Sequence, residues 1–286
     1  MQKTGKRCDL HTHTVHSDGT YTPSELVSAA QDIGLSAIAL TDHNTVSGLC
    51  EFVSAAKESG IEYAAGVEFS TEYEDKELHI IGMFVRPEHY SEIESFIGNL
   101  KEKKNEANRA LVARLLPLGY EIDYDALLAS TPDGYVNRAH IAVEMIRRGY
   151  VKSFGEAFDG VLSESAGYYV PPRRRGAFET IDFIKSIGAV SVLAHPLLQL
   201  SHSELEVFLS EAVKHGLCAI ETQYVRYTED EREFSSEIAQ KFSLLESGGS
   251  DFHGDNKPYQ RLGVGKGDLF VPYEFYERLK EKSQEL

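Results

Sequence analysis

The chain has 286 residues, 42% of them hydrophobic, and carries a formal net charge of −16. This length suits one large α/β domain or a barrel with an insertion. No apolar run approaches the roughly 20 residues that a membrane-spanning helix needs, so we expect no membrane partner. The acidic charge argues against a stable nucleic-acid complex, because such a surface needs lysines and arginines along the phosphates.

The cysteines and the start of the chain predict where the protein resides. Cys8, Cys50 and Cys218 are odd in number and form no C-x-x-C pair. This fits a reducing compartment and argues against a disulfide framework or a thiolate zinc site. Residues 1–7 have the charge of a signal peptide's start, but no apolar segment follows them. The sequence therefore predicts a cytoplasmic protein.

The first and last thirds of the chain alternate strand-like and helix-like runs. A helix is expected to begin at Pro23, with Thr22 as its N-cap and Glu25 completing a capping box. Strands are expected at 7–11, 35–40, 61–68, 78–85, 189–194, 217–221 and 242–246. Helices are expected at 46–59, 178–187, 203–215, 230–241 and from 272 onward. Repeated strand–helix units predict a parallel sheet, either open or closed into a barrel.

The middle of the chain breaks this alternation. Ile93, Phe96 and Ile97, then Leu111 and Leu115, recur at helical spacing. A stretch this long between strands is too large for a loop. We therefore expect an α/β domain built from 1–87 and 177–286, and a helical insertion subdomain over 88–176.

Histidines and carboxylates recur at the ends of the expected strands. His11 and His13 bracket one residue, so in an extended chain their side chains point to the same side. Asp251 and His253 repeat this spacing within a glycine-rich turn. Comparable positions hold Asp18, Asp42, His43, Glu68, His79 and His195. Because functional side chains collect at the carboxyl ends of parallel strands, we expect these residues to lie together.

Imidazoles and carboxylates without thiolates suit Mn, Fe or Zn. So many ligands indicate more than one ion, and clustered ions are typical of enzymes that hydrolyse a phosphate or an amide. Each residue alone also has a plainer explanation, such as a core histidine, a solvated glutamate or the turn at Asp18. Asp42 could itself be a ligand, but we expect it to orient the His43 ring through a hydrogen bond.

These motifs, taken in order, resemble those of the PHP (polymerase and histidinol phosphatase) family. They are His11-Thr12-His13, Ser17-Asp18-Gly19, Thr41-Asp42-His43, Gly66-Val67-Glu68, His79, Ala194-His195-Pro196 and Ser250-Asp251-Phe252-His253. The resemblance implies a distorted (β/α)7 barrel with a trinuclear centre of divalent ions, with Mn favoured over Fe and Zn. It implies that the first ion binds His11, His13, Glu68 and Asp251, the second Glu68, His79 and His195, and the third Asp18, His43 and His253.

Within that family, the short chain with a helical insertion looks like the branch of nucleoside 3′,5′-bisphosphate phosphatases and ribonuclease AM-like exoribonucleases. Arg138-Ala139-His140 is similar to the Arg-x-His segment of that branch. The resemblance implies that Arg138 and His140 contact the substrate phosphate and that the insertion caps the active site. The expected reaction is water attack on a phosphomonoester of a small nucleotide or on the 5′ end of short RNA.

Other interpretations remain open from the sequence. Histidinol phosphatases share the metal motifs, so histidinol phosphate is an alternative substrate. Amidohydrolases on a (β/α)8 barrel also begin with His-x-His, although they normally carry a carboxylated lysine where Glu68 would act here. A non-catalytic metal-bound module that binds a phosphorylated ligand is the alternative of another class. The plainer explanation for Arg138 and His140 is a solvated helix start. The basic run 171–175 either lines the mouth of the site or is a solvated linker.

Overall fold

The computed structural model describes residues 5–98, 100–131 and 136–286. Residues 1–4, which hold part of the charged start discussed above, lie outside the described residues. The chain forms two compact units, one comprising 1–96 with 174–286 and the other comprising 97–173. The first unit contains the whole sheet, and the second is helical.

The sheet of the first unit follows the order β1-β2-β3-β4-β6-β7-β8, and the short β5 pairs with β3. The strands are β1 (Cys8–Asp9), β2 (Ala37–Leu40), β3 (Glu62–Tyr73), β4 (Lys76–Met83), β5 (Arg175–Gly176), β6 (Val190–Ala194), β7 (Ala219–Tyr224) and β8 (Leu245–Gly249). Just after β1, the backbone N–H of Leu10 donates to the Gly248 carbonyl at 3.0 Å, which links the two ends of this path. The sheet therefore nearly closes, and the expected distorted (β/α)7 barrel is confirmed.

One strand departs from the expected parallel arrangement. β4 runs antiparallel to both of its neighbours, β3 and β6. The reason is local, because only Glu74 and Asp75 connect β3 to β4, and both have positive φ values of 48° and 62°. A two-residue turn of this kind joins antiparallel strands and leaves no room for a crossover helix. The beginning of β4 therefore lies at the sheet edge where the parallel strands end.

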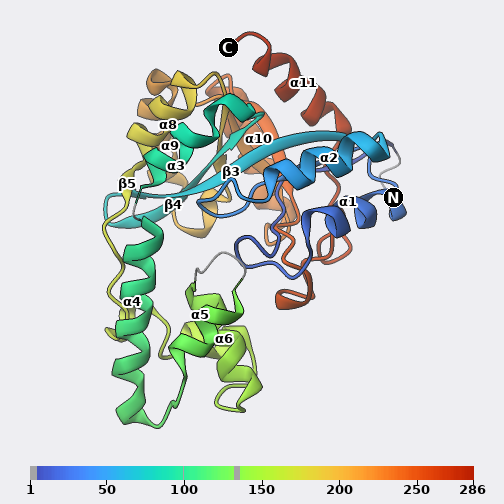
Figure 1. Cartoon of the computed structure of the whole chain (residues 1–286). Coiled ribbons are helices and arrows are strands. Elements are labelled where there is room, and N and C mark those ends of the chain that lie inside the picture. The colour runs from blue at the N-terminus through green and yellow to red at the C-terminus, as the bar shows by residue number, and fades with distance from the viewer. Residues whose placement is uncertain (1–4, 99, 132–135) are drawn as a thin grey trace. The chain divides into compact units, whose positions relative to one another are not determined.

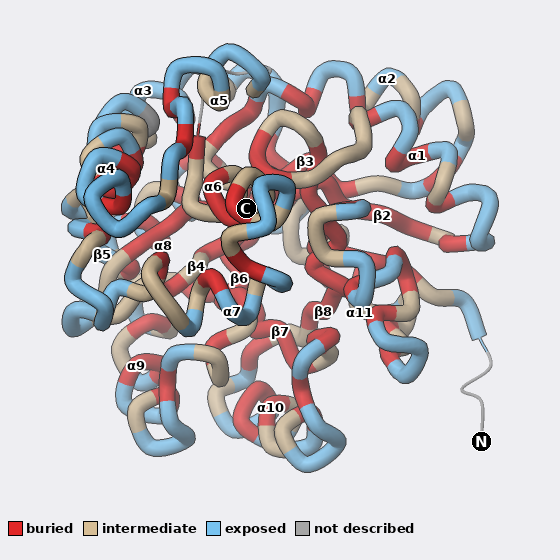
Figure 2. The backbone as a smooth tube through the Cα atoms, turned by 90° about the horizontal axis from the view of Figure 1, so that it is seen from below, coloured by how far each residue is buried: buried red, intermediate tan, exposed pale blue. Residues whose placement is uncertain are grey.

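Helices lie around the outside of this sheet (Figure 1). They are α1 (Pro23–Asp32), α2 (Leu49–Ser59), α3 (Tyr90–Ile97), α8 (Ala177–Ser186), α9 (His202–His215), α10 (Glu229–Lys241) and α11 (Tyr273–Ser283). The expected capping box at Thr22 and Glu25 is present, and α2 ends at the left-handed Gly60. Figure 2 shows buried residues concentrated along the strands, while the helices alternate buried and exposed stretches. The barrel core includes Leu10, Ile81, Val192 and Tyr276.

The second unit has a core of its own. Its helices are α4 (Leu100–Leu115), α5 (Tyr124–Ser130), α6 (Arg138–Arg147) and α7 (Phe154–Asp159). Leu111, Leu115, Ile141 and Met145 are fully buried together, as their helical spacing predicts. Among the described residues of the chain, no helix has the length and apolarity to span a membrane.

Candidate metal centre

The His-x-His pair lies directly after β1, at the edge where the parallel strands end. His11 and His13 are fully buried, and their Nε2 atoms lie 3.1 Å apart. The intervening Thr12 faces the other way, and its hydroxyl donates to the carbonyl of Ala39. Both imidazoles therefore point to the same side, as the alternation of an extended chain predicts.

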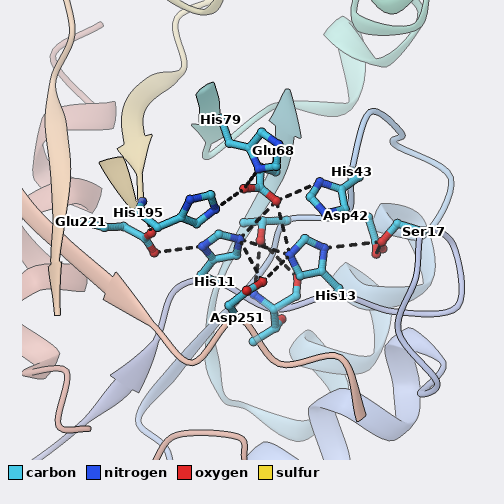
Figure 3. Close-up of polar contacts among 12 residues, drawn as sticks. His11, His13, Ser17, Asp42, His43, Glu68, His79, His195, Glu221 and Asp251 are labelled. Carbon is cyan, nitrogen blue, oxygen red and sulfur yellow. Dashed lines mark hydrogen bonds and ion pairs between the residues drawn. The ribbon is translucent and has the colours of Figure 1, made fainter. Parts of the chain in front are cut away.

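Glu68 lies at the centre of the histidines (Figure 3). Its Oε1 lies 2.7 Å from Nδ1 of His79 and 3.0 Å from Nε2 of His195. Its Oε2 lies 2.9 Å from Nδ1 of His43 and 3.2 Å from Nε2 of His11. The expectation that Glu68 ends its strand is wrong, because β3 continues to Tyr73. His79 comes within reach because β4 runs antiparallel and begins at the same edge.

Two aspartates complete the cluster. Oδ1 of Asp251 lies 3.2 Å from Nε2 of His13, and Oδ1 of Asp18 lies 3.2 Å from Nε2 of His253. The other Asp251 oxygen is bound by the Tyr224 hydroxyl at 2.9 Å. The structure thus brings together the residues expected as metal ligands, which are His11, His13, Asp18, His43, Glu68, His79, His195, Asp251 and His253.

The donor atoms of this cluster fit divalent cations. They form four overlapping groups in which the ligand atoms lie within 4.8 Å of one another. Oδ1 of Asp18, Nδ1 of His43 and Oε2 of Glu68 are buried and have no hydrogen-bond partner in the described part of the chain. Although His43 and Glu68 lie close, these two atoms are not aligned for a hydrogen bond. Buried polar atoms without partners are costly, and cations would compensate these.

The charges of the cluster also favour cations. Burial alone would raise the pKa of Glu68, but His79, His11 and His43 hold the pKa of this carboxyl well below its usual value. Burial would likewise raise the pKa of Asp251, and Lys257 and neighbouring imidazoles outweigh it. The carboxylates are therefore ionised at neutral pH, which is the form that binds metal.

The outward-facing nitrogens of the imidazoles have partners that orient the rings. Nδ1 of His11 lies 2.9 Å from the Glu221 carboxylate, and Nε2 of His79 lies 3.4 Å from Glu77. Nδ1 of His253 lies 2.7 Å from the Asp251 carbonyl. Such partners fix which ring nitrogen faces a metal. Sequence reasoning missed Glu221 and Glu77, and the only signal for Glu221 was its place at the end of an expected strand.

Asp42 binds the turn that leads from His13 to Asp18. Its fully buried carboxylate accepts hydrogen bonds from the backbone N–H of Thr14 at 2.7 Å and from the hydroxyl of Ser17 at 2.5 Å. Burial raises the pKa of Asp42 despite these donors. These contacts of its carboxylate thus go to the 14–17 turn, in the segment that carries His13 and Asp18.

Arg138 and His140 belong to the second unit, where they begin α6. Nδ1 of His140 accepts the backbone N–H of Asn137 at 3.2 Å, and Asn137 caps the helix in return. Arg138 donates to Glu164 at 3.1 Å, and its guanidinium lies 4.3 Å from the ring centre of Tyr169. The other residues expected at the site all lie in the first unit, whereas Arg138 and His140 do not.

Metal binding at this cluster is expected to stabilise the fold. An ion present at 100 times its dissociation constant adds about 2.7 kcal/mol to the free energy of unfolding. We expect the melting temperature to rise by about 5 °C or more when Mn²⁺ is added to chelator-treated protein. Calorimetry with and without Mn²⁺, against NaCl of equal ionic strength, measures this. Equal melting temperatures at saturating Mn²⁺ would contradict metal binding.

Comparison with known proteins agrees with this geometry. The PHP domain matches residues 9–181 of the chain. A 5′-3′ exoribonuclease of Haemophilus influenzae is 32% identical over 87% of this chain and 90% of its own length. A 3′,5′-nucleoside bisphosphate phosphatase of Chromobacterium violaceum is 27% identical over 89% of this chain and 90% of its own.

Solved structures show the same architecture along nearly the whole chain. A protein from Bifidobacterium adolescentis, proposed to be a metal-dependent phosphoesterase, superposes with a TM-score of 0.86 at 29% identity and covers 98% of both chains. A protein from Chromobacterium violaceum described as an amidohydrolase, with bound sulfate and no metal, also gives 0.86, at 25% identity over 96% of both chains. The matched motifs and the buried cluster agree, and the chain therefore belongs to the PHP domain family.

Proposed function

We propose that this metal-dependent phosphoesterase hydrolyses a phosphomonoester of a small nucleotide, such as a nucleoside 3′,5′-bisphosphate, or acts at the 5′ end of short RNA. The observation that carries the proposal is the buried His/Asp/Glu cluster with its unpartnered donor atoms. The names of the relatives, an exoribonuclease and a bisphosphate phosphatase, support the nucleotide class. An acidic chain can act on such an anion where cations supply the local positive charge.

We further propose three divalent ions, with Mn favoured over Fe and Zn. The first would bind His11, His13, Glu68 and Asp251. The second would bind Glu68, His79 and His195, and the third Asp18, His43 and His253. Two ligand groups support the first and third positions, one with His11, His13 and Asp251 and one with Asp18, His43 and His253. His79 and His195 each join Glu68, but in different groups. Mixed nitrogen and oxygen donors accept all three metals.

The chemistry follows from these donors. Ions held here would supply positive charge at the phosphoryl oxygens and lower the pKa of an attacking water. Glu68 would connect neighbouring ion positions, because imidazole nitrogens lie close to both of its oxygens. The sequence contains no recognisable Ser or Cys nucleophile motif, which favours direct water attack over a covalent intermediate. The protein is proposed to act in the cytoplasm.

Arg138 and His140 are proposed to bind the substrate phosphate. The guanidinium presents two parallel donors that match two phosphate oxygens. Because Nδ1 of His140 accepts a backbone N–H, the proton of the neutral ring resides on Nε2. His140 could therefore supply a proton to the leaving alkoxide only from Nε2.

Arg138→Ala is expected to lower kcat/KM for a bisphosphate while leaving metal binding unchanged. A lost charge-assisted hydrogen bond costs about 1.5–3 kcal/mol, which corresponds to roughly 10- to 150-fold. Steady-state kinetics with metal analysis measures both effects. Arg147→Ala is the matched control, because Arg147 lies on the same helix and pairs with Glu144 at the surface. Parent-like kinetics in Arg138→Ala would show that Arg138 does not hold the phosphate.

The substrate class is tested by phosphate release with added Mn²⁺ from adenosine 3′,5′-bisphosphate, AMP, histidinol phosphate and a short 5′-phosphorylated RNA. We expect turnover of the bisphosphate or the RNA in preference to histidinol phosphate. Turnover of histidinol phosphate alone would overturn the nucleotide proposal. No turnover of any of the four by metal-loaded protein would favour a binding module.

A further inference from the structure

Glu221 has no place in the ligand set, yet it is fully buried beside it. It lies on β7, opposite Ser247 of β8, where the register shifts between Glu221 and Gln223. Such a bulge re-aims the neighbouring side chain. Figure 3 shows the carboxylate beside His11 and His195, on the side away from Glu68.

Each oxygen of Glu221 binds a different metal-ligand residue. Oε1 lies 2.9 Å from Nδ1 of His11, and Oε2 accepts the backbone N–H of His195 at 2.7 Å. His11 follows β1, whereas His195 follows β6, so the carboxylate connects two parts of the barrel that are distant along the chain. Both oxygens of Glu221 thus have hydrogen-bond partners already. Glu221 belongs to none of the four ligand groups.

The backbone of His195 needs this support. It adopts φ 31° and ψ 49°, a left-handed conformation that is unfavourable for a residue with a side chain. The hydrogen bond from its N–H to Glu221 holds that conformation, which directs the ring toward Glu68. Strained backbone of this kind persists only where surrounding contacts determine it.

The His11 contact fixes a tautomer. With a carboxylate at Nδ1, the ring keeps a proton there, so Nε2, which lies 3.2 Å from Glu68, is the nitrogen that would face an ion. The rings of His11 and His195 stack with their centres 5.5 Å apart. One buried carboxylate thus controls the direction of two imidazoles that face the same glutamate.

We propose that Glu221 is a positioning residue that sets the metal affinity of the two ion positions sharing Glu68, by locking the His11 tautomer and the His195 turn. This inference rests on the proposed metal-dependent function. Loss of an outer partner of a metal-ligating histidine typically weakens metal binding 10- to 100-fold. The ligands themselves remain in place, so the effect falls on affinity and not on the number of ligands.

Glu221→Gln tests the inference because glutamine keeps the volume but offers only one acceptor to two donors. If its amide N–H₂ faces the His195 N–H, two donors oppose each other. If it faces the His11 ring, it donates to Nδ1 and favours the wrong tautomer. Glu246→Gln is the matched control, since Glu246 is a half-buried carboxylate on the adjacent β8 that binds the hydroxyls of Thr222 and Ser236. Glu221→Asp serves as a second variant that keeps the charge but is too short to reach both donors.

The probe is Mn²⁺ alone, added to chelator-treated full-length protein. Free Mn²⁺ is measured by EPR, bound Mn²⁺ by elemental analysis, and the spin coupling of adjacent bound ions by the EPR line shape. We expect Glu221→Gln and Glu221→Asp to weaken Mn²⁺ binding 10- to 100-fold and to lose the coupled signal at Mn²⁺ concentrations that saturate the parent. Glu246→Gln should match the parent, and circular dichroism of the metal-free proteins checks folding.

The outcomes separate the inference from the proposed function. Parent-like Mn²⁺ affinity and coupling in a folded Glu221 variant would overturn the inference alone. A parent that binds Mn²⁺ but hydrolyses no phosphate ester would overturn the proposed function and leave the metal result for Glu221 standing. A parent that binds no Mn²⁺ would overturn both. If Glu221→Gln does not fold, Glu221→Asp tests the inference by the same criteria. If neither variant folds, the inference is overturned, and Glu221 has a purely structural role.

Discussion

Replacing Glu68 with glutamine is expected to produce the largest loss of activity of any single isosteric change in this chain. The carboxylate contacts imidazoles through both oxygens, and Oε2 is buried without a hydrogen-bond partner. An amide has no negative charge, and its N–H₂ group would face a ligand nitrogen or a cation. We expect kcat/KM to fall at least ~10³-fold, because an ion supplies several kcal/mol to the transition state and 1.4 kcal/mol is tenfold.

Phosphate-release kinetics and metal analysis of Glu68→Gln test this expectation together. Glu72→Gln is the control, because Glu72 lies on the same strand, four residues beyond Glu68, and belongs to none of the ligand groups. Unchanged circular dichroism would show that the barrel has formed. A folded Glu68→Gln that keeps full metal content and parent kinetics would contradict the central role of this carboxylate.

The shared direction of His11 and His13 was predictable because its cause is local. His11 and His13 follow a short strand and alternate with Thr12, so residue spacing alone predicts a shared direction. The capping box at Thr22 and the left-handed Gly60 are likewise properties of neighbouring residues. Such features depend on the dihedral angles of a few adjacent residues, and they are retained in the folded chain.

The direction of β4 was not predictable by the same reasoning. Glu74 and Asp75 are not glycines, yet both adopt positive φ values in the turn between β3 and β4. No helix was expected between the strands at 61–68 and 78–85, but the segment between them holds no glycine, proline or asparagine that would mark a hairpin turn. Because β4 is antiparallel, its beginning lies at the edge where the parallel strands end. This explains why His79, within β4, reaches Glu68.

The residues that contact the outer nitrogens of the histidines could not be predicted from the sequence either. Glu221 lies far from His11 and His195 along the chain, and no histidine or glycine-rich turn marks it. It lies at a register shift between β7 and β8, and such a shift depends on the pairing of two strands. Sequence reasoning could therefore name the residues of the buried cluster, but not the groups that contact their outward-facing nitrogens.

Asp9 illustrates how closure of the barrel and formation of the site depend on one carboxylate. It ends β1 and is fully buried. Its Oδ1 accepts the backbone N–H of Ser250 at 2.9 Å, and its Oδ2 accepts the N–H of Gly263 at 2.8 Å and the Ser250 hydroxyl at 2.5 Å. Burial raises the pKa of Asp9 in spite of these donors. The side chain thus joins the first strand to the loops that follow β8, directly beside Asp251.

Asp9→Ala is expected to lower the free energy of unfolding by about 3–5 kcal/mol. The substitution leaves several buried donors unpaired, at about 1–3 kcal/mol each, and effects of this size mark the loss of a buried network. Urea unfolding followed by far-ultraviolet circular dichroism measures the change. Asp32→Ala, at the exposed end of α1, should differ from the parent by less than about 0.5 kcal/mol.

The same substitution distinguishes two roles of Asp9. If it only closes the barrel, a folded Asp9→Ala protein at low temperature should bind Mn²⁺ as tightly as the parent. If it also fixes Asp251, as its contacts with the adjacent Ser250 indicate, Mn²⁺ affinity should fall together with stability. We expect the second result, because Asp251 itself has a positive φ of 50° and relies on its neighbours to hold that conformation.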